Sequence, residues 1–137
     1  MSNKGGCFCG STRISYDGDA KMKALCHCLD CRKISGSTYS TNIIVDDSSF
    51  KVQGTPKEIS KTADGGNTIT SYFCPDCGTT LFRKGKTFEG KVIIKAGVMD
   101  DVQALEAAKP TAELFTEHRV GWVPETAGAQ QMKGMGS

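Results

Sequence analysis

Three cysteines fall within six positions of this chain, at Cys26, Cys28 and Cys31, and two cations follow at Arg32 and Lys33. Thiols this dense are either disulfide-bonded or bound to a metal. Cysteines so close in sequence cannot easily bridge one another without strain, which argues against a disulfide. Thiolates suit zinc well. The cluster therefore predicts a zinc site with three local ligands and an open fourth position, which is typical of zinc that takes part in chemistry.

Four further cysteines form two pairs, Cys7 with Cys9 and Cys74 with Cys77. On an extended backbone, side chains at i and i+2 point to the same face, so one metal can take both thiols of the first pair. Two small buried residues in a strand are the alternative. The second pair lies in Cys74-Pro-Asp-Cys77-Gly78, a zinc-knuckle sequence whose glycine lets backbone amides point at sulfur.

Two divisions of the seven cysteines stay open at this point. In the first, the pairs at 7/9 and 74/77 hold a structural zinc, and Cys26, Cys28 and Cys31 hold a catalytic zinc. In the second, Cys28 and Cys31 join the 74/77 pair as an ordinary zinc ribbon. We favour the first, because it uses every cysteine and closes a long loop, so that metal-binding energy becomes folding energy. It predicts two Zn²⁺ per chain.

Segments of β-branched and alternating residues between glycine and aspartate turns predict a mainly β fold. The expected strands cover residues 14–16, 37–45, 50–52, 58–62, 68–73, 79–82 and 91–96. Residues 4–16 are expected to form a glycine-flanked turn that runs into the first strand, and residues 63–67 a hairpin turn. A short helical turn ended by Gly36 should follow Cys31, and a short helix is expected within 100–108.

The length of 137 residues suits one domain with a modest core, which we place at 1–123 with a flexible tail at 124–137. The formal net charge is +2, and seven thiolates with two zinc ions would bring it to −1. This balance argues against nucleic-acid binding. No apolar run reaches the ~20 residues of a membrane helix, and the polar start of the chain does not resemble a signal peptide. We therefore expect a cytoplasmic protein with reduced thiols, and a homodimer stays open.

Several polar residues near the cysteine cluster are candidates for chemistry. Asp30 lies inside the metal loop and is the acid–base candidate. Arg32 and Lys33 could bind an anionic substrate, with a solvated helix face as the alternative. Ser35 and Tyr39 could donate hydrogen bonds to a small polar substrate, with strand packing as the alternative. His27, between two ligands, should point away from the metal and play a supporting or structural role, and His118 should lie at the surface.

The cysteine pattern resembles the glutathione-dependent formaldehyde-activating enzyme family, also called centromere-protein-V-like. Its matching motifs are Gly5-Gly6-Cys7-x-Cys9-Gly10, Cys26-His27-Cys28-x2-Cys31-Arg32-Lys33-x-Ser35-Gly36-Ser37 and Phe73-Cys74-x2-Cys77-Gly78. Gly97-Val-Met-Asp100-Asp101 and the spacing of Pro110, Phe115 and Trp122 are also similar to the family. One departure is Glu113, where members often carry histidine.

The resemblance implies an Mss4-like fold of twisted antiparallel sheets with short helical turns and two zinc sites. It implies a zinc-dependent carbon–sulfur lyase that joins formaldehyde and glutathione to S-(hydroxymethyl)glutathione, or catalyses the reverse, with the catalytic zinc on Cys26, Cys28 and Cys31. The substrate is then glutathione or another small thiol adduct. The alternatives are a lyase or isomerase of the same fold acting on a different small metabolite, and a non-catalytic zinc-ribbon-like binding module.

Overall fold

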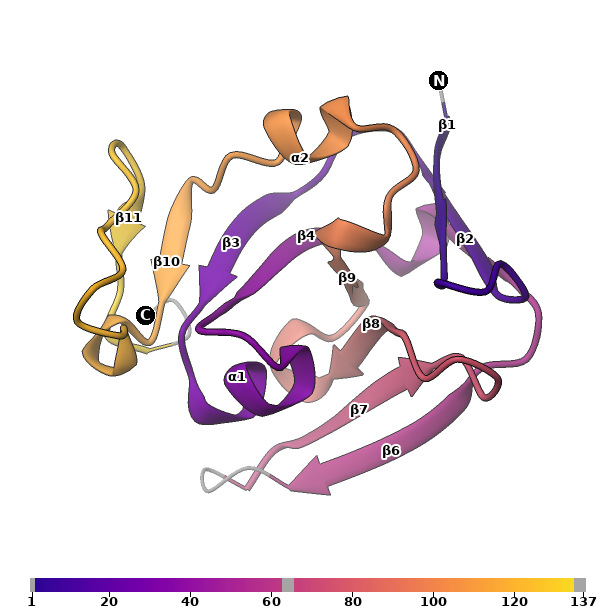
Figure 1. Cartoon of the computed structure of the whole chain (residues 1–137), viewed down its shortest axis with the longest axis horizontal. Helices are drawn as coiled ribbons and strands as arrows, with labels where there is room; N and C mark the ends of the chain where they lie inside the picture. The colour runs from indigo at the N-terminus through magenta and orange to yellow at the C-terminus, as the bar shows by residue number, and fades with distance from the viewer. Residues whose placement is uncertain (1, 63–65, 135–137) are drawn as a thin grey trace.

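The structure, a computed structural model, describes residues 2–62 and 66–134, and two β-sheets dominate it (Figure 1). A three-stranded sheet has the order β1-β2-β5, and an eight-stranded sheet has the order β11-β10-β3-β4-β9-β8-β7-β6. The strands are β1 (Ser2–Gly6), β2 (Arg13–Asp17), β3 (Met22–Cys26), β4 (Ser40–Asp46), β5 (Phe50–Gln53), β6 (Lys57–Thr62), β7 (Thr68–Phe73), β8 (Thr80–Gly85), β9 (Lys91–Lys95), β10 (Ala112–Leu114) and β11 (Gln130–Gln131). The mainly β class is thus confirmed, and the architecture is consistent with an Mss4-like fold.

The strands pair antiparallel in both sheets except at one end of the larger sheet. There, β10 runs parallel to both β3 and β11. The helical elements are short: α1 (Leu29–Ser35), α2 (Gln103–Ala107) and the 3-10 helices η1 (Asp47–Ser49), η2 (Lys86–Phe88), η3 (Ala96–Val98) and η4 (Thr116–His118). The larger sheet is therefore mixed at this end, whereas the family resemblance implies antiparallel sheets.

The main hydrophobic core lies against one face of the larger sheet and includes residues of β2. Strand β9 shows how the two faces are separated, because Val92 and Ile94 are fully buried in the core and alternate with Ile93 and Lys95. Phe82 of β8 stacks on a neighbouring aromatic ring, with 4.5 Å between the ring centroids of Phe82 and Tyr72. The cavity described below lies on the opposite face of the same strands.

Strand β1 was missed by the sequence prediction, which expected a glycine-flanked turn at the start of residues 4–16. It pairs with β2 along its length, and Gly5 also bridges to Met99. A Cβ atom on Gly5 would lie 2.5 Å from the carbonyl oxygen of Val98, so only glycine permits this approach. The ion pair between Arg13 of β2 and Asp100 also connects the β1–β2 pair to the segment that contains Val98 and Met99.

Helix α1 begins at Leu29, three residues before Arg32, where the sequence analysis placed its start. Cys28 caps its first turn, and Gly36 ends it in the left-handed conformation with its N–H bonded to the Arg32 carbonyl, as expected. The expected hairpin joins β6 to β7, which pair at Thr62 and Thr68, although residues 63–65 of its turn lie outside the described residues.

The segment after residue 123 packs against the domain as far as the structure describes it. Gln130–Gln131 forms β11 beside β10, and the Thr126 amide donates to Glu113 Oε2 over 2.7 Å. Residues of the segment 124–134 are thus bonded to β10, and residues 135–137 lie outside the described residues. Among the helices of the described ranges, none is both long and apolar enough to cross a membrane.

Candidate metal centres and their cavity

The structure gathers the cysteines into two separate clusters. The four-thiol cluster contains Cys7, Cys9, Cys74 and Cys77, and the three-thiol cluster contains Cys26, Cys28 and Cys31. Within each cluster all sulfur atoms lie within 4.8 Å of one another, and all seven thiols are free of disulfides. These groups match the first division of the cysteines, and the 74/77 pair does not join Cys28 and Cys31 as a zinc ribbon would require.

The four-thiol cluster joins the loop after β1 to the loop after β7. The Sγ of Cys9 lies 3.7 Å from those of both Cys7 and Cys74. Backbone amides point at two of the sulfurs: the Thr12 N–H donates to Cys7 Sγ over 3.3 Å, and the Asp76 N–H to Cys74 Sγ over 3.4 Å. Backbone amides that donate to sulfur stabilise thiolates. The four cysteine sulfurs therefore fit a tetrahedral zinc with four sulfur ligands.

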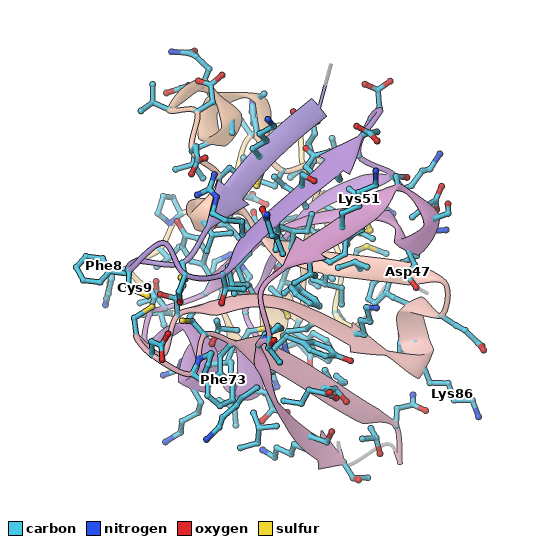
Figure 2. The ribbon with its side chains drawn as sticks, turned by 90° about the vertical axis from the view of Figure 1, so that its right-hand side faces the viewer. Phe8, Cys9, Asp47, Lys51, Phe73 and Lys86 are labelled. Carbon is cyan, nitrogen blue, oxygen red and sulfur yellow. The ribbon has the colours of Figure 1, made fainter. Side chains whose placement is uncertain are left out.

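The local conformation of the first pair differs from the expected one. Cys7 and Cys9 lie in a turn closed by the Gly10 N–H and the Cys7 carbonyl, 3.1 Å apart, not on an extended strand. Phe8 between them points away from the molecule, at the edge visible in Figure 2. The Ser11 hydroxyl, 3.2 Å from Cys74 Sγ, lowers the pKa of Cys74 to about 5, because a donated hydrogen bond stabilises the thiolate.

The three-thiol cluster forms where β3 passes into α1. Cys26 ends the strand, Cys28 is the N-cap residue of the helix, and Cys31 lies in its first turn. The Cys31 N–H donates to Cys28 Sγ over 3.3 Å, so the capping contact also fixes the spacing of two thiols. Hydrogen bonds from the thiols of Cys26 and Cys28 lower the pKa of Cys31 to about 2 despite its burial. Cys31 therefore favours the thiolate that a metal ligand needs, whereas hydrogen bonding with the neighbouring thiols raises the pKa of Cys26, and the pKa of Cys28 is raised as well.

A cavity of about 220 Å³ opens beside the three-thiol cluster, and all three cysteines line it. It lies on the sheet face opposite the main core. Its apolar wall comes from five strands of the larger sheet, from η2 and from the residue after β10, through Ala24, Ile44, Ile69, Phe88, Ile93, Leu114 and Phe115. None of the four thiols of the other cluster lines this cavity.

Two cations that the sequence analysis did not select also line this cavity, Arg83 of β8 and Lys95 of β9. Arg83 is only 7% exposed; its Nε donates to Ser71 Oγ over 3.0 Å and its Nη1 to Cys31 Sγ over 3.8 Å. Lys95 donates to Asn42 Oδ1 over 2.8 Å. Burial lowers the pKa of Lys95 to about 8, against the opposing effect of the Cys31 thiolate, so the amine still carries its charge at neutral pH.

The sequence contains a feature that could have identified these two residues as buried functional cations. Arg83 follows Leu81 and Phe82 in one strand, and Lys95 follows Ile93 and Ile94 in another. A charged residue within an apolar, central strand is a candidate for a buried functional charge. Which sheet face each one occupies depends on strand register, which the sequence alone does not give.

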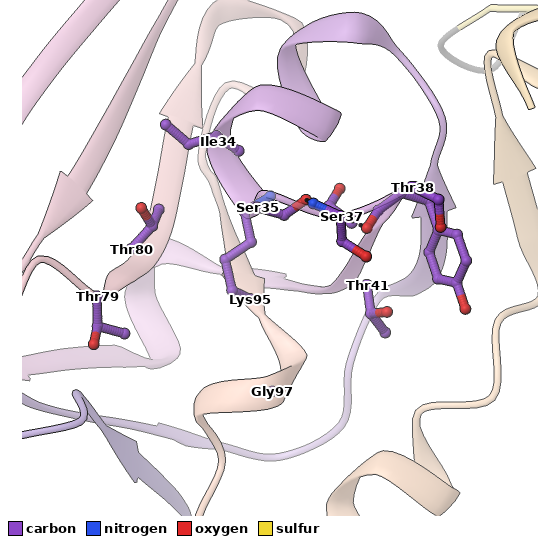
Figure 3. Close-up of a pocket in the computed structure, with 11 residues that line it drawn as sticks. Ile34, Ser35, Ser37, Thr38, Thr41, Thr79, Thr80, Lys95 and Gly97 are labelled. Carbon is purple, nitrogen blue, oxygen red and sulfur yellow. Dashed lines mark hydrogen bonds between the residues drawn. The ribbon is translucent and has the colours of Figure 1, made fainter. Parts of the chain in front are cut away.

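The acid–base and substrate-binding residues predicted from the sequence lie in three different places. Asp30 lines the cavity of the three-thiol cluster and pairs with Lys61 over 2.5 Å. Arg32 and Lys33 are exposed on α1 and are not among the residues lining that cavity. Ser35 and Tyr39 line a second cavity of about 510 Å³, where Lys95 lies between Thr79 and Thr80 on one side and Ser37 and Thr41 on the other (Figure 3).

His27 points away from the three-thiol cavity and is fully buried beneath it. Its Nε2 lies 2.7 Å from Oε1 of Glu113, which is equally inaccessible to solvent. The other carboxylate oxygen accepts hydrogen bonds from the Thr126 N–H and the Gln131 side chain. Burial by itself raises the pKa of Glu113, but these donors, with His27 and the charge of Arg119, lower it to about 2. Glu113 thus holds His27 and does not line the cavity.

Taken together, the two sheets and the two thiol clusters define a mainly β protein with one closed and one open candidate metal site. The family model for the glutathione-dependent formaldehyde-activating enzyme matches residues 2–118. The chain belongs to this family.

Two individual proteins are also similar to this chain, one in sequence and one in fold. A protein of Penicillium rubens, named for the same glutathione-dependent formaldehyde-activating enzyme, is 29% identical over 100 residues, which cover 69% of this chain and 52% of that protein. The chain therefore spans about half the length of the curated relative it matches. A crystal structure of a Rhodobacter sphaeroides protein superposes with a TM-score of 0.56 at 17% identity, over 76% of this chain and 94% of the other. That likeness supports the fold.

Proposed function

We propose that this protein is a zinc-dependent carbon–sulfur lyase that acts on a small thiol adduct. One observation carries the proposal. Three free thiols line a cavity, so the fourth ligand position of a metal that they hold would face that cavity, whereas the other four thiols form a complete set of ligands. In this proposal Cys7, Cys9, Cys74 and Cys77 hold a structural zinc, and Cys26, Cys28 and Cys31 hold a catalytic zinc. Family membership supports the same class of chemistry.

The chemistry required of the residues is modest. A zinc bound by the three thiolates would offer its fourth position to a substrate sulfur. The three cysteines then orient that sulfur toward the cavity, and the apolar wall limits the access of water. Asp30, which lines the same cavity, is the acid–base group that we assign. Its Oδ1 accepts a hydrogen bond from Lys61 Nζ over 2.5 Å, which fixes the position of the carboxyl group.

The proposed reaction is the addition of a thiol to formaldehyde. A carbon–sulfur bond forms between the thiol sulfur and the aldehyde carbon, and the carbon–oxygen double bond becomes a single bond. The thiol proton is accepted by Asp30 and returned to the aldehyde oxygen, which gives the S-hydroxymethyl adduct. The reverse reaction breaks the same bond, and neither direction needs an oxidant or a reductant.

Glutathione is the first thiol to test, since the family is named for it. Glutathione at a hundredfold excess over its dissociation constant should stabilise the folded protein by about 2.7 kcal/mol. S-methylglutathione should stabilise it much less, because the methyl group removes the thiolate and leaves both carboxylates in place. Equal shifts of the melting temperature with the two compounds would show that the sulfur is not held by the three-thiol cluster.

The exposed cations of α1 are proposed to attract a larger anionic substrate such as glutathione. The double substitution Arg32→Glu with Lys33→Glu should weaken glutathione binding without releasing zinc. The loss should be larger at low salt than at high salt, because exposed charges are screened. Calorimetric titrations at two salt concentrations test this, and a salt-independent effect would contradict it.

Activity can be measured directly as formation of the thiol adduct above the uncatalysed rate, for example by exchange NMR with formaldehyde. The wild-type protein should accelerate the exchange, and Cys28→Ser should not. A second candidate, a lyase or isomerase of the same fold acting on another small metabolite, is favoured by the size of the cavity, because 220 Å³ lies below the roughly 300–1,000 Å³ of ordinary ligand pockets. Thiol binding without formaldehyde exchange would favour that candidate.

A further inference from the structure

The cavity beside the three-thiol cluster carries more positive charge than its metal site can balance. Three thiolates with one Zn²⁺ retain a single negative charge, whereas Arg83 and Lys95 contribute two positive charges. Asp30 does not change this balance, because it pairs with Lys61. Before a substrate binds, one positive charge is therefore left over in a partly enclosed space, where an unbalanced charge is costly.

Within the part of the chain that the structure describes, neither cation forms an ion pair with a carboxylate. Arg83 is bonded to a hydroxyl and a thiol, and Lys95 to an amide oxygen. The two are also close enough for the charge of Arg83 to disfavour the charge of Lys95. Two like charges held together in this way suit an anion that contacts both, and the guanidinium of arginine matches a carboxylate in geometry.

The dimensions of the cavity limit what that anion can be. Its 220 Å³ cannot enclose a whole peptide, and Arg83 Nη1 lies only 3.8 Å from a sulfur of the three-thiol cluster. A carboxylate that reaches Arg83 must therefore lie near the substrate sulfur. Glutathione carries its carboxylates at its two ends, separated from its sulfur by amide groups, so it does not offer a carboxylate at this position in an extended conformation.

We infer that Arg83 and Lys95 form an anion subsite beside the three-thiol cluster, and that the substrate is a short mercaptocarboxylate whose sulfur and carboxylate are a few bonds apart. This inference rests on the proposed function, because it assumes that the three-thiol cluster takes the sulfur. Asn42 acts as a positioning residue, since its Oδ1 holds the Lys95 amine and its Nδ2 is fixed by the Ala24 carbonyl over 3.1 Å.

The test compares two thiols of equal length on the zinc-loaded protein: 3-mercaptopropionate and 3-mercapto-1-propanol. Calorimetry should give an affinity at least about tenfold higher for the acid, in line with a charge-assisted hydrogen bond. Arg83→Gln and Lys95→Met should each reduce this preference to near one. Lys51→Met, an exposed lysine of β5 labelled in Figure 2, is the matched control and should keep the preference. Zinc content is measured for every variant, so loss of metal is recognised.

Each other outcome has a definite meaning. Equal affinity for the acid and the alcohol overturns the anion subsite and leaves the proposed function standing. Failure of both thiols, and of glutathione, to bind a protein that retains its zinc overturns both. A preference for the acid that survives in Arg83→Gln and Lys95→Met shows that other groups hold the carboxylate. Glutathione binding more tightly than 3-mercaptopropionate overturns the proposed substrate class. The comparison on the wild-type protein remains decisive even if a variant does not fold.

Discussion

Replacing Cys74 with serine should leave the chain without a cooperative unfolding transition at 25 °C. Cys74 is fully buried in the four-thiol cluster and joins the loop after β7 to the loop after β1. A structural zinc site contributes an apparent binding free energy of about 10–16 kcal/mol, as large as the whole stability of a typical domain, about 5–15 kcal/mol. The loss of one ligand should therefore remove most of the folding free energy. Cys7→Ser should behave in the same way.

Cys28→Ser is the matched control, since it changes the same atom in the other cluster. Serine is a good N-cap residue, so the start of α1 keeps its capping hydrogen bond. The variant should stay folded and lose only the metal of the three-thiol cluster. Thermal unfolding followed by circular dichroism checks the contrast. Equal melting temperatures for the Cys7, Cys28 and Cys74 variants would contradict the division into a structural and a catalytic cluster.

The second large effect is expected at Glu113, which the family comparison alone would not have connected with stability. Glu113→Ala removes the partner of a fully buried imidazole and of Arg119, whose Nη2 lies 3.4 Å from the same carboxylate oxygen. Removing one partner of a buried pair costs about 3–5 kcal/mol, which corresponds to a fall in melting temperature of roughly 10–20 °C for a domain of this size. Chemical denaturation measures the loss.

Two substitutions serve as controls for Glu113→Ala. Glu117→Ala changes an exposed carboxylate four residues away and should alter stability by less than about 0.5 kcal/mol. Glu113→Gln keeps the shape and one acceptor, so its effect should be intermediate. If Glu113→Ala is no more destabilising than Glu117→Ala, the buried pair with His27 is not an important part of the fold.

The lowered pKa of Glu113 also predicts how the free energy of unfolding depends on pH. Its pKa is lowered from 4.5 to about 2 in the folded protein, so the unfolded chain binds more protons between these values. The stability that the carboxylate contributes is therefore complete above pH 4.5 and is lost as the pH falls toward 2. The difference in unfolding free energy between wild type and Glu113→Gln should begin to narrow below pH 4.5, and a difference that narrows already near pH 6 would contradict this assignment.

Local sequence chemistry predicted the parts of the structure that depend on local geometry. The knuckle at 74–78, the end of α1 at Gly36 and the central strands at 68–73 and 91–96 all follow from turn residues and β-branched runs. The grouping of the cysteines could also be predicted, because few divisions use all seven.

The features that the sequence analysis missed depend on contacts between distant residues. Strand β1 has little intrinsic strand preference and is held by β2 and by the approach of Val98 to Gly5. Gln130–Gln131 becomes a strand only because β10 offers an edge for pairing. Arg83 and Lys95 reach the same cavity through the register of β8 and β9, which no local pattern encodes.

The most direct test of this account is the zinc content of the purified chain, measured by mass spectrometry under native conditions together with a mild chelator. We predict two zinc ions per wild-type chain, of which the one on Cys26, Cys28 and Cys31 leaves first, and one zinc ion in Cys28→Ser. A single zinc in the wild-type chain that is lost in both Cys28→Ser and Cys74→Ser would contradict the account, because it would require one site shared between the two clusters.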